Sequence, residues 1–436
     1  MGMLMNLSFA HIKQRFLSNQ LLKDSFWAVW GNSLGYAFFL LSGIIIARFL
    51  GKDLYGEYGL VKTTMFQLAA FSTLGLGYTS TKFIAEYRSK KDAHLLSITQ
   101  AAIKITVFTS TVLALIFLIG AEPLSRFINE PTMVLPFRTL GIIIILRAVG
   151  TTQIGLLSGY GDFKAIAINN VVSGLFMFVA CVPLTYYWSL KGSLLSLLLS
   201  QVLMVVFNYR ATHRIRLTLP PQEATSFYKQ LIVFSIPVTL QEFTFALRYW
   251  FGLILITKYA SKGEVGLYTA AALWQSIILF IPSFLSNVIL SHLSYLTSDP
   301  QKQVKTVNKM LFINILCTVV PLVFVILFAN WITALYGPTF TGLTIVIDVL
   351  GFAAIFNCCA NVISAEMIAE NRIWALAIAR CTRDLLMLFI VYLVLSRMNV
   401  TAAAYTYSMI EAVCFAGFFL FIYVYYLITI KRKITT

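Results

Sequence analysis

Long apolar runs constrain the fold of this chain more than any other feature of its sequence. A helix needs about 20 consecutive, predominantly apolar residues to cross a bilayer. The runs that qualify are 25–49, 57–79, 96–120, 135–157, 165–188, 191–209, 230–257, 265–290, 307–331, 342–367, 373–396 and 402–429. Only 11% of the residues are charged, whereas soluble domains carry about 25%. We therefore predict an all-α polytopic membrane protein with twelve transmembrane helices.

The basic residues predict the orientation. With the N-terminus inside, the inner segments carry nineteen Lys and Arg residues and the outer segments nine. By the positive-inside rule, both termini are expected in the cytoplasm. The formal charge of +16 is spread over short loops, so it does not predict nucleic-acid binding. The six cysteines all fall in apolar runs and lack metal-site spacing with His, so no metal or cofactor is expected.

A weak internal repeat divides the spans into two groups of six. When the chain is shifted by 210 residues, Arg48 falls on Lys258 and Gly56 on Gly266, and no gap is needed over about 120 positions. An even number of spans per repeat makes the repeats parallel, and such repeats place a substrate path between two bundles that rock. The predicted segments are a cytoplasmic amphipathic lead-in (1–24), an N-terminal six-helix bundle (25–209), a cytoplasmic linker (210–229), a C-terminal six-helix bundle (230–430) and a basic tail (431–436).

Several charged side chains lie inside the predicted spans. A charge at mid-bilayer is costly unless it faces water or a partner. Arg147 and Arg248 have no acidic residue three or four positions away on their own helix, so we expect both to line a cavity. Arg380 has an alternative, because Asp384 at i+4 could pair with it. The residues predicted to line a cationic cavity are Arg48, Arg147, Arg248, Arg380 and Arg383.

Polar residues at helical spacing predict the rest of the cavity lining. Gln241, Thr244 and Arg248 share one helix face, and Asn357 and Asn361 share another. With Asn32, these residues form the predicted polar lining: Asn32, Gln241, Thr244, Asn357 and Asn361. Because the Arg fork suits phosphate oxygens, the cavity is expected to bind an anionic, phosphorylated solute that carries hydroxyl groups.

Three stretches resemble one known family. IIIARFLGKDLYGEYGLVKTTMFQLAAFSTLGLGYTSTKFIAEYRSKKD (44–92) is similar to the first hairpin and following loop of bacterial polysaccharide-biosynthesis exporters. LLSGYGDFKAIAI (156–168) and its echo EMIAENRIWALAI (366–378) resemble two later connections of the same family. These exporters are the O-antigen-type repeat-unit flippases of the multidrug/oligosaccharidyl-lipid/polysaccharide exporter superfamily. The resemblance implies a MATE-like arrangement of two parallel six-helix bundles.

The resemblance also implies a function. Such proteins move an undecaprenyl-diphosphate-linked oligosaccharide to the outer leaflet of the bacterial inner membrane, for O-antigen, capsule or exopolysaccharide synthesis. Polysaccharide polymerase and chain-length proteins would be partners, with the membrane lipids, and Arg48 would handle the headgroup or act in gating. If transport is ion-coupled, the candidate residues are Glu242, Asp348, Glu366 and Glu411.

Other functions are less consistent with the sequence. Lipid II flippases of this superfamily usually have two further C-terminal spans, and none is expected here. An ion-coupled multidrug extruder is the alternative, although in this chain Arg competes with the intramembrane acids that extruders use. No P-loop, Ser-His-Asp set or metal-ligand spacing predicts an enzyme.

Overall fold

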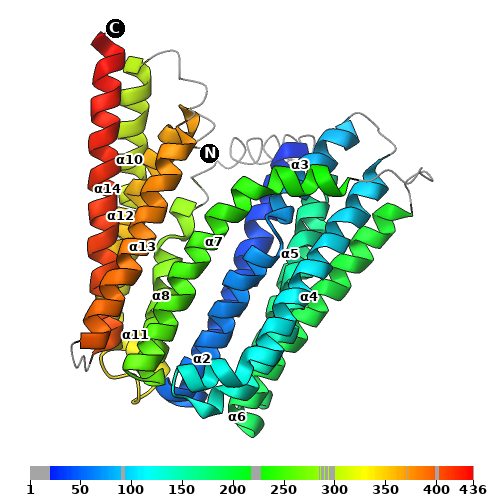
Figure 1. The fold of residues 1–436 in the computed structure, drawn as a ribbon, viewed down its shortest axis with the longest axis vertical. Helices are drawn as coiled ribbons and strands as arrows, with labels where there is room; N and C mark the ends of the chain where they lie inside the picture. Colours follow the sequence, from blue (N-terminus) through cyan, green and yellow to red (C-terminus); the bar gives the residue numbers. More distant parts are fainter. Residues whose placement is uncertain are drawn as a thin grey trace, which may run out of the picture. The chain divides into compact units, whose positions relative to one another are not determined.

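The computed structural model describes residues 20–89, 94–217, 227–283, 285, 289, 293, 300–370, 372–397 and 402–435. These residues are helical apart from short turns, and none of them forms a strand. The helices are α2 (Gln20–Ser72), α3 (Leu76–Ser89), α4 (Leu95–Phe127), α5 (Val134–Tyr160), α6 (Phe163–Arg216), α7 (Tyr228–Tyr259), α8 (Lys262–Ile278), α10 (Pro300–Leu327), α11 (Ala329–Tyr336), α12 (Leu343–Ala369), α13 (Ile373–Arg397) and α14 (Ala403–Thr435). A 3-10 turn, η1 (Pro131–Met133), precedes α5. Figure 1 shows their course.

Two of these helices each contain a pair of predicted spans. The backbone of α2 is non-helical at Gly51, with φ 69° and ψ 173°. That of α6 is non-helical at Ser189, with φ 50° and ψ −131°. A positive φ is unstrained for glycine, which has no Cβ, but uncommon for serine. Each break lies between two predicted spans, so the helices on either side correspond to separate crossings.

The second and ninth predicted spans differ from the observed helices. The run 57–79 was expected to be one helix, but α2 ends at Ser72 and α3 begins at Leu76. Leu74 and Gly75 both have positive φ in the intervening turn, which the TLGLG sequence permits because glycine adopts this conformation freely. The run 307–331 likewise covers the end of α10 and the start of α11.

The surface of the helices is suited to lipid. Seven helical stretches among the described residues are long and apolar enough to cross a membrane. Large apolar side chains such as Phe108, Ile119 and Val179 are 70%, 78% and 60% exposed, which would be unfavourable in water over so wide an area. The chain is a multi-pass membrane protein.

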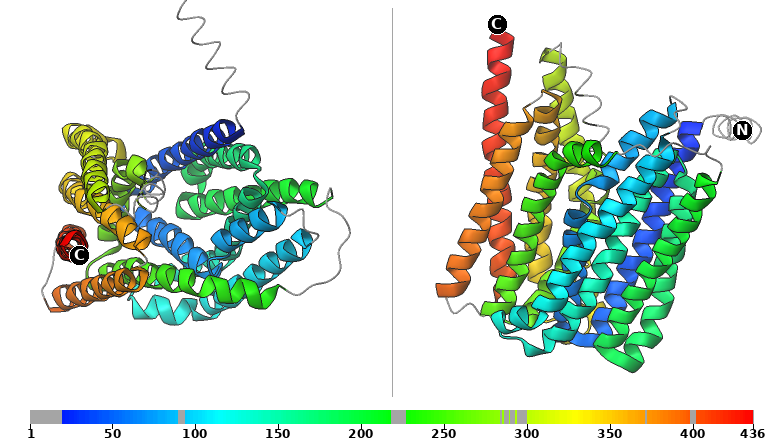
Figure 2. Two further views of the ribbon diagram at one scale, coloured as in Figure 1. Left: turned by 90° about the horizontal axis from the view of Figure 1, so that it is seen from above. Right: turned by 45° about the vertical axis from the view of Figure 1, so that its right-hand side comes forward.

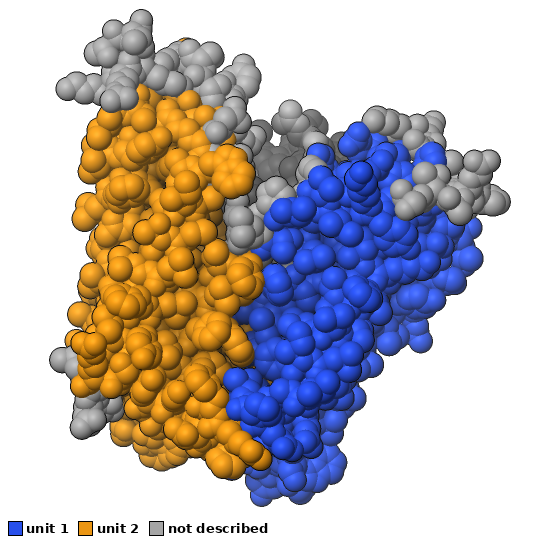
Figure 3. Space-filling model, viewed as in Figure 1, with its two compact units in different colours: residues 1–46, 64–124, 132–242 blue, residues 47–63, 125–131, 243–436 orange. Residues whose placement is uncertain are grey.

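The chain forms two compact units, coloured separately in Figure 3. Unit 1 comprises residues 1–46, 64–124 and 132–242, and unit 2 comprises residues 47–63, 125–131 and 243–436. The two predicted bundles were continuous segments, 25–209 and 230–430. In the structure, the kink of α2 and the loop after α4 instead belong to unit 2, together with the C-terminal part of the chain. The bundle boundaries therefore stay a prediction.

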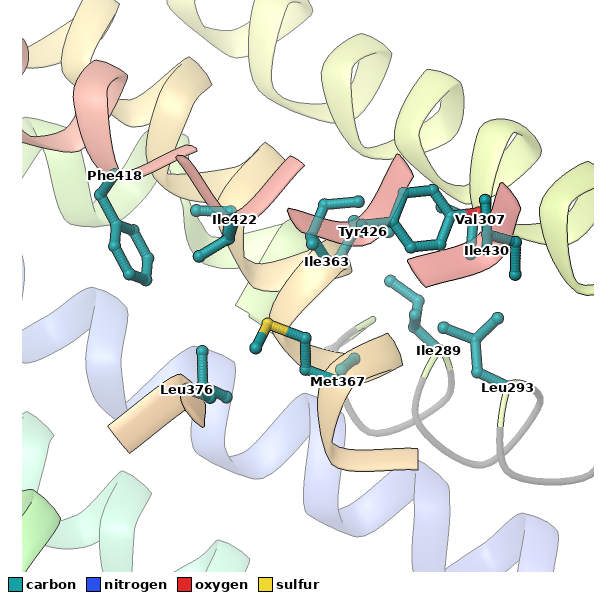
Figure 4. Packing of buried hydrophobic residues seen from close by; sticks show 13 residues of the cluster. Ile289, Leu293, Val307, Ile363, Met367, Leu376, Phe418, Ile422, Tyr426 and Ile430 are labelled. Atoms are coloured by element: carbon teal, nitrogen blue, oxygen red, sulfur yellow. The ribbon is translucent and has the colours of Figure 1, made fainter. Parts of the chain in front are cut away.

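Each unit has its own core. In unit 1, α5 packs against α3 and α6, and the long helices run roughly side by side (Figure 2). In unit 2, α12 is central and contacts α8, α10, α13 and α14. Figure 4 shows Ile363 and Met367 of α12 within the same apolar cluster as Ile422 and Tyr426 of α14. These cores fix the helix faces that carry the charged residues described next.

Candidate functional site

Four charged residues of unit 2 form one network, which we call the charge cluster: Arg248, Arg383, Asp384 and Glu411. The Nε of Arg248 lies 3.2 Å from Asp384 Oδ1, and its Nη1 lies 3.3 Å from Glu411 Oε1. Arg383 donates from Nη2 to the same Asp384 oxygen, at 2.8 Å. Tyr268 of α8 donates its hydroxyl to Glu411 Oε2, at 2.8 Å. The cluster thus joins α7, α13 and α14, and Tyr268 connects it to α8.

Aromatic rings surround the two guanidinium groups of the charge cluster. The Cζ of Arg383 lies 4.7 Å from the ring centre of Phe415 and 4.6 Å from that of Phe418. The Cζ of Arg248 lies 5.3 Å from the ring centre of Phe245. Because ring faces attract cations within about 6 Å, these contacts add to the ion pairs. Two guanidiniums and two carboxylates balance one another, so the cluster carries no formal net charge.

The charge cluster corrects two expectations about the arginines. Arg248 was expected to face a cavity because its own helix offers no acid, but it is only 2% exposed and pairs with acids of α13 and α14. Asp384 was a possible partner of Arg380, but the structure pairs it with Arg383 and Arg248. Arg380 is half-buried on α13. Sequence spacing on one helix could not reveal partners on another.

Arg147 of α5 in unit 1 is in a different environment. Its Cζ lies 4.5 Å from the ring centre of Phe66, and its Nη1 lies 3.8 Å from the sulfur of Met204, a weak acceptor. The Thr151 hydroxyl, one turn further along α5, donates to the Arg147 carbonyl oxygen at 2.9 Å. Among the described residues, no carboxylate is within ion-pair distance of this half-buried side chain. Within the described part of the chain, Arg147 therefore holds a cation inside a span without an acidic partner.

Arg48 is at the end of a predicted span, beside the kink in α2. It is exposed, and its Nη1 is 3.4 Å from the carbonyl oxygen of Leu335 at the end of α11. Next to it, a cavity of about 440 Å³ is lined by Leu50, Gly51, Lys52, Asp53, Leu54, Pro338, Thr339 and Thr341. Lys258, the counterpart of Arg48 in the second repeat, instead places Nζ 3.7 Å from the ring centre of Phe127. The two equivalent cations therefore make different contacts.

The repeat offset of 210 residues reappears where α2 crosses α8 in unit 2. A Cβ on Gly56 would collide with the carbonyl oxygen of Lys262, and a Cβ on Gly266 would collide with that of Lys52. Because 56 pairs with 262 while 266 pairs with 52, the contact is symmetric under the repeat. Only glycine lets the two backbones approach so closely. We call this contact the glycine crossing.

One ion-pair group at this crossing was not predicted. Lys262 Nζ lies 2.7 Å from Glu57 Oε1 and 3.1 Å from Glu130 Oε2. Burial of the Lys262 ammonium lowers its pKa, but the hydrogen bonds and negative charges of Glu57 and Glu130 outweigh this effect and the pKa is raised. Glu57 is 2% exposed. We call Glu57, Glu130 and Lys262 the carboxylate clasp.

The remaining predicted site residues are dispersed. The side chains of Asn32, Gln241 and Glu242 lie outside the described part of the structure. Thr244, Asn357, Asn361 and Asp348 are half-buried. Glu366 is fully buried in unit 2 and accepts a hydrogen bond from Gln303 Nε2 at 3.3 Å. Sequence reasoning missed Gln303, which also donates to Glu370 at 2.9 Å, because a glutamine at a helix start is unremarkable by itself.

A family model described as polysaccharide biosynthesis protein matches residues 21–292, which is more than half of the chain. The chain belongs to the polysaccharide biosynthesis protein family. This family member is 23% identical over 317 residues to stage V sporulation protein B of Bacillus subtilis (strain 168), covering 67% of this chain and 60% of that protein. It is also 23% identical over 253 residues to the succinoglycan biosynthesis transport protein ExoT of Rhizobium meliloti (strain 1021). That alignment covers 58% of this chain and 49% of ExoT.

Solved structures establish the fold of this family member. An inward-facing multidrug resistance MATE family transporter of the MOP superfamily superposes with a TM-score of 0.76 at 15% identity, covering 93% of this chain and 99% of the other. The lipid II flippase MurJ, in an inward closed conformation, superposes with a TM-score of 0.68 at 14% identity, covering 94% and 92%. These likenesses confirm the predicted MATE-like, all-helical fold. At such low identity they carry no information about substrate.

Proposed function

We propose that this protein is a flippase for a lipid-linked oligosaccharide, specifically one linked to undecaprenyl diphosphate. It moves the oligosaccharide from the cytoplasmic to the outer leaflet of the bacterial inner membrane by alternating access, for synthesis of O-antigen, capsule or exopolysaccharide. Family membership supports the substrate class, and the positive-inside distribution supports cytoplasmic termini. The chain spans 60% and 49% of the length of the two curated relatives that it matches.

Arg147 is the observation that carries this proposal. A cation inside a span is expensive unless water or a counter-charge solvates it, and no acid among the described residues does so. A diphosphate would supply the missing charge, and the guanidinium fork can bind two phosphate oxygens at once. We assign Arg147 as the main headgroup ligand, with Arg380 and Arg48 as secondary candidates. Arg248 and Arg383 are assigned to the charge cluster, which is already neutral.

The direction of transport has an electrical rationale. An inside-negative membrane potential favours outward movement of anions by about 2.3 kcal/mol per charge per 100 mV. A diphosphate therefore gains free energy when it crosses from the cytoplasmic side with its charge exposed to the potential. We propose no ion-coupling residue with priority, since Glu411 is held by Arg248 and Tyr268 and Glu366 is held by Gln303.

The test is a deletion strain complemented with variants of the chain. Loss of surface polysaccharide, with undecaprenyl-diphosphate oligosaccharide accumulating on the cytoplasmic face, would support the flippase, and mass spectrometry of that lipid would identify the sugars. Complementation by the unaltered chain should restore export, whereas Arg147→Ala at equal protein level should not. Normal surface glycan together with retention of cationic dyes would instead establish the multidrug extruder.

A further inference from the structure

The carboxylate clasp breaks the symmetry of the glycine crossing. Lys52 and Lys262 are counterparts under the repeat, as are Gly56 and Gly266. The counterpart of Glu57, however, is Leu267, which is 4% exposed. The close backbone contact therefore forms without a charge on one side. A buried carboxylate is unfavourable compared with a buried leucine, so packing alone does not account for Glu57.

The clasp connects three segments that are distant in the sequence. Glu57 comes from α2, Glu130 from the turn after α4, and Lys262 from the first turn of α8. Although Glu57 is buried, the side chains of Lys262 and Glu130 are 21% and 24% exposed. Water can therefore reach one side of the clasp. A contact that is strong when closed and can be solvated when opened is suited to reversible release.

We propose that the carboxylate clasp is a latch on the glycine crossing, closed in this conformation and released when the outer end of the protein opens. This inference rests on the proposed function and on its predicted orientation, which places the clasp at the outer surface. Within unit 2, Lys262 holds Glu57 and Glu130, and with them the segments 47–63 and 125–131, against the start of α8. When the outer end opens, water and other polar groups replace these ion pairs.

The first experiment measures accessibility and needs no substrate. In a chain whose six cysteines have been replaced, Thr269→Cys places a buried thiol opposite Gly59 at the crossing. Glu57→Gln with Lys262→Gln removes both ion pairs and leaves one charge, the Glu130 carboxylate, whose side chain is 24% exposed and can be solvated by water. We expect a membrane-impermeant maleimide, applied from outside, to label the thiol at position 269 about tenfold faster in this variant than in the Thr269→Cys chain with an intact clasp. A tenfold change in the opening equilibrium corresponds to about 1.4 kcal/mol of free energy.

The matched control is the exposed pair Glu122 and Arg138, 3.0 Å apart with side chains 55% and 52% exposed. Glu122→Gln with Arg138→Gln makes the same chemical change at a site that water already solvates, so the labelling rate should stay within twofold of the parent. If the clasp variant labels no faster than this control, the latch is refuted. Each variant is accepted as folded if its elution volume in size-exclusion chromatography in detergent is unchanged.

The second experiment locks the crossing. A Cβ built on Gly59 lies 3.0 Å from the Cβ of Thr269, within about half an ångström of disulfide geometry. Gly59→Cys with Thr269→Cys should form a disulfide that stops glycan export, and reduction should restore export. Full export by the oxidised protein would overturn the latch and leave the flippase intact. If the chain without these two cysteines exports no glycan under reducing conditions, the proposed function fails. The labelling rates still test the latch in that case, because they do not depend on substrate.

Discussion

Asp384→Asn tests whether the charge cluster is structural. The Asp384 carboxylate is 3% exposed and contacts two guanidiniums, Arg383 at 2.8 Å and Arg248 at 3.2 Å. Removing one member of a buried ion pair typically costs about 3–5 kcal/mol, because the remaining charge stays buried without compensation. Here Glu411 still neutralises Arg248, but Arg383 loses its carboxylate. We therefore expect a loss of about 3 kcal/mol from the stability of unit 2.

The assay is thermal unfolding of the purified protein in detergent, followed by tryptophan fluorescence. Unfolding entropies of about 2 cal/mol/K per residue imply a shift of about 2 °C per kcal/mol for a unit of roughly 200 residues. Asp384→Asn should lower the Tm by about 6 °C. Asp384→Asn with Arg383→Gln should recover part of this loss, because the unpaired cation is removed.

Glu122→Gln is the control for this prediction. Its partner Arg138 is exposed, and surface ion pairs are worth about 0–1 kcal/mol, so the Tm should change by no more than about 2 °C. If Asp384→Asn unfolds within 1 °C of the unaltered protein, then the network does not stabilise unit 2. The arginines of α7 and α13 would then be available for substrate after all.

Three further outcomes are expected. Arg147→Ala should lower glycan export, measured as surface glycan, at least tenfold at equal protein level, whereas Arg147→Lys should keep part of the export. Equal export by the unaltered protein and both variants would contradict the headgroup role. Gly56→Ala should destabilise the protein, because its methyl group meets the carbonyl of Lys262, whereas Gly120→Ala has nothing within 4 Å and should leave the Tm unchanged or slightly higher. Arg48→Ala removes only one long, exposed hydrogen bond and should reduce export less than Arg147→Ala does.

The helices could be predicted from the sequence because apolar run length determines them almost alone. The run 135–157 corresponds to α5 at Val134–Tyr160, and 373–396 corresponds to α13 at Ile373–Arg397. In the described part of the chain, the predicted runs differ from the helices where backbone conformation interrupts an apolar stretch, as in the turn at Leu74 and Gly75. Such a break depends on local φ and ψ, which hydropathy does not record.

The charge partners could not be predicted, because they depend on which helix faces meet. Arg248 and Glu411 are 163 residues apart in the sequence, and Lys262 and Glu57 are 205 residues apart. The spacing rule for one helix correctly found that Arg147 and Arg248 lack local acids. The spacing rule could not distinguish Arg147 from Arg248. In the structure, two acids lie beside Arg248, and none of the described acids lies beside Arg147.

The two repeats share the glycine crossing but not the charges of the charge cluster or of Arg147. Gly56 and Gly266 are equivalent and pack against each other. At the same offset, Arg147 is replaced by Asn357, Arg248 by Phe38, and Asp384 by Gly174. A symmetric substrate path would require matched ligands in both repeats. One repeat contains Arg147, which has no counter-charge among the described residues, and the other contains the neutralised cluster. A diphosphate should therefore bind to the N-terminal repeat, and the C-terminal repeat should contribute mainly a stable helical framework.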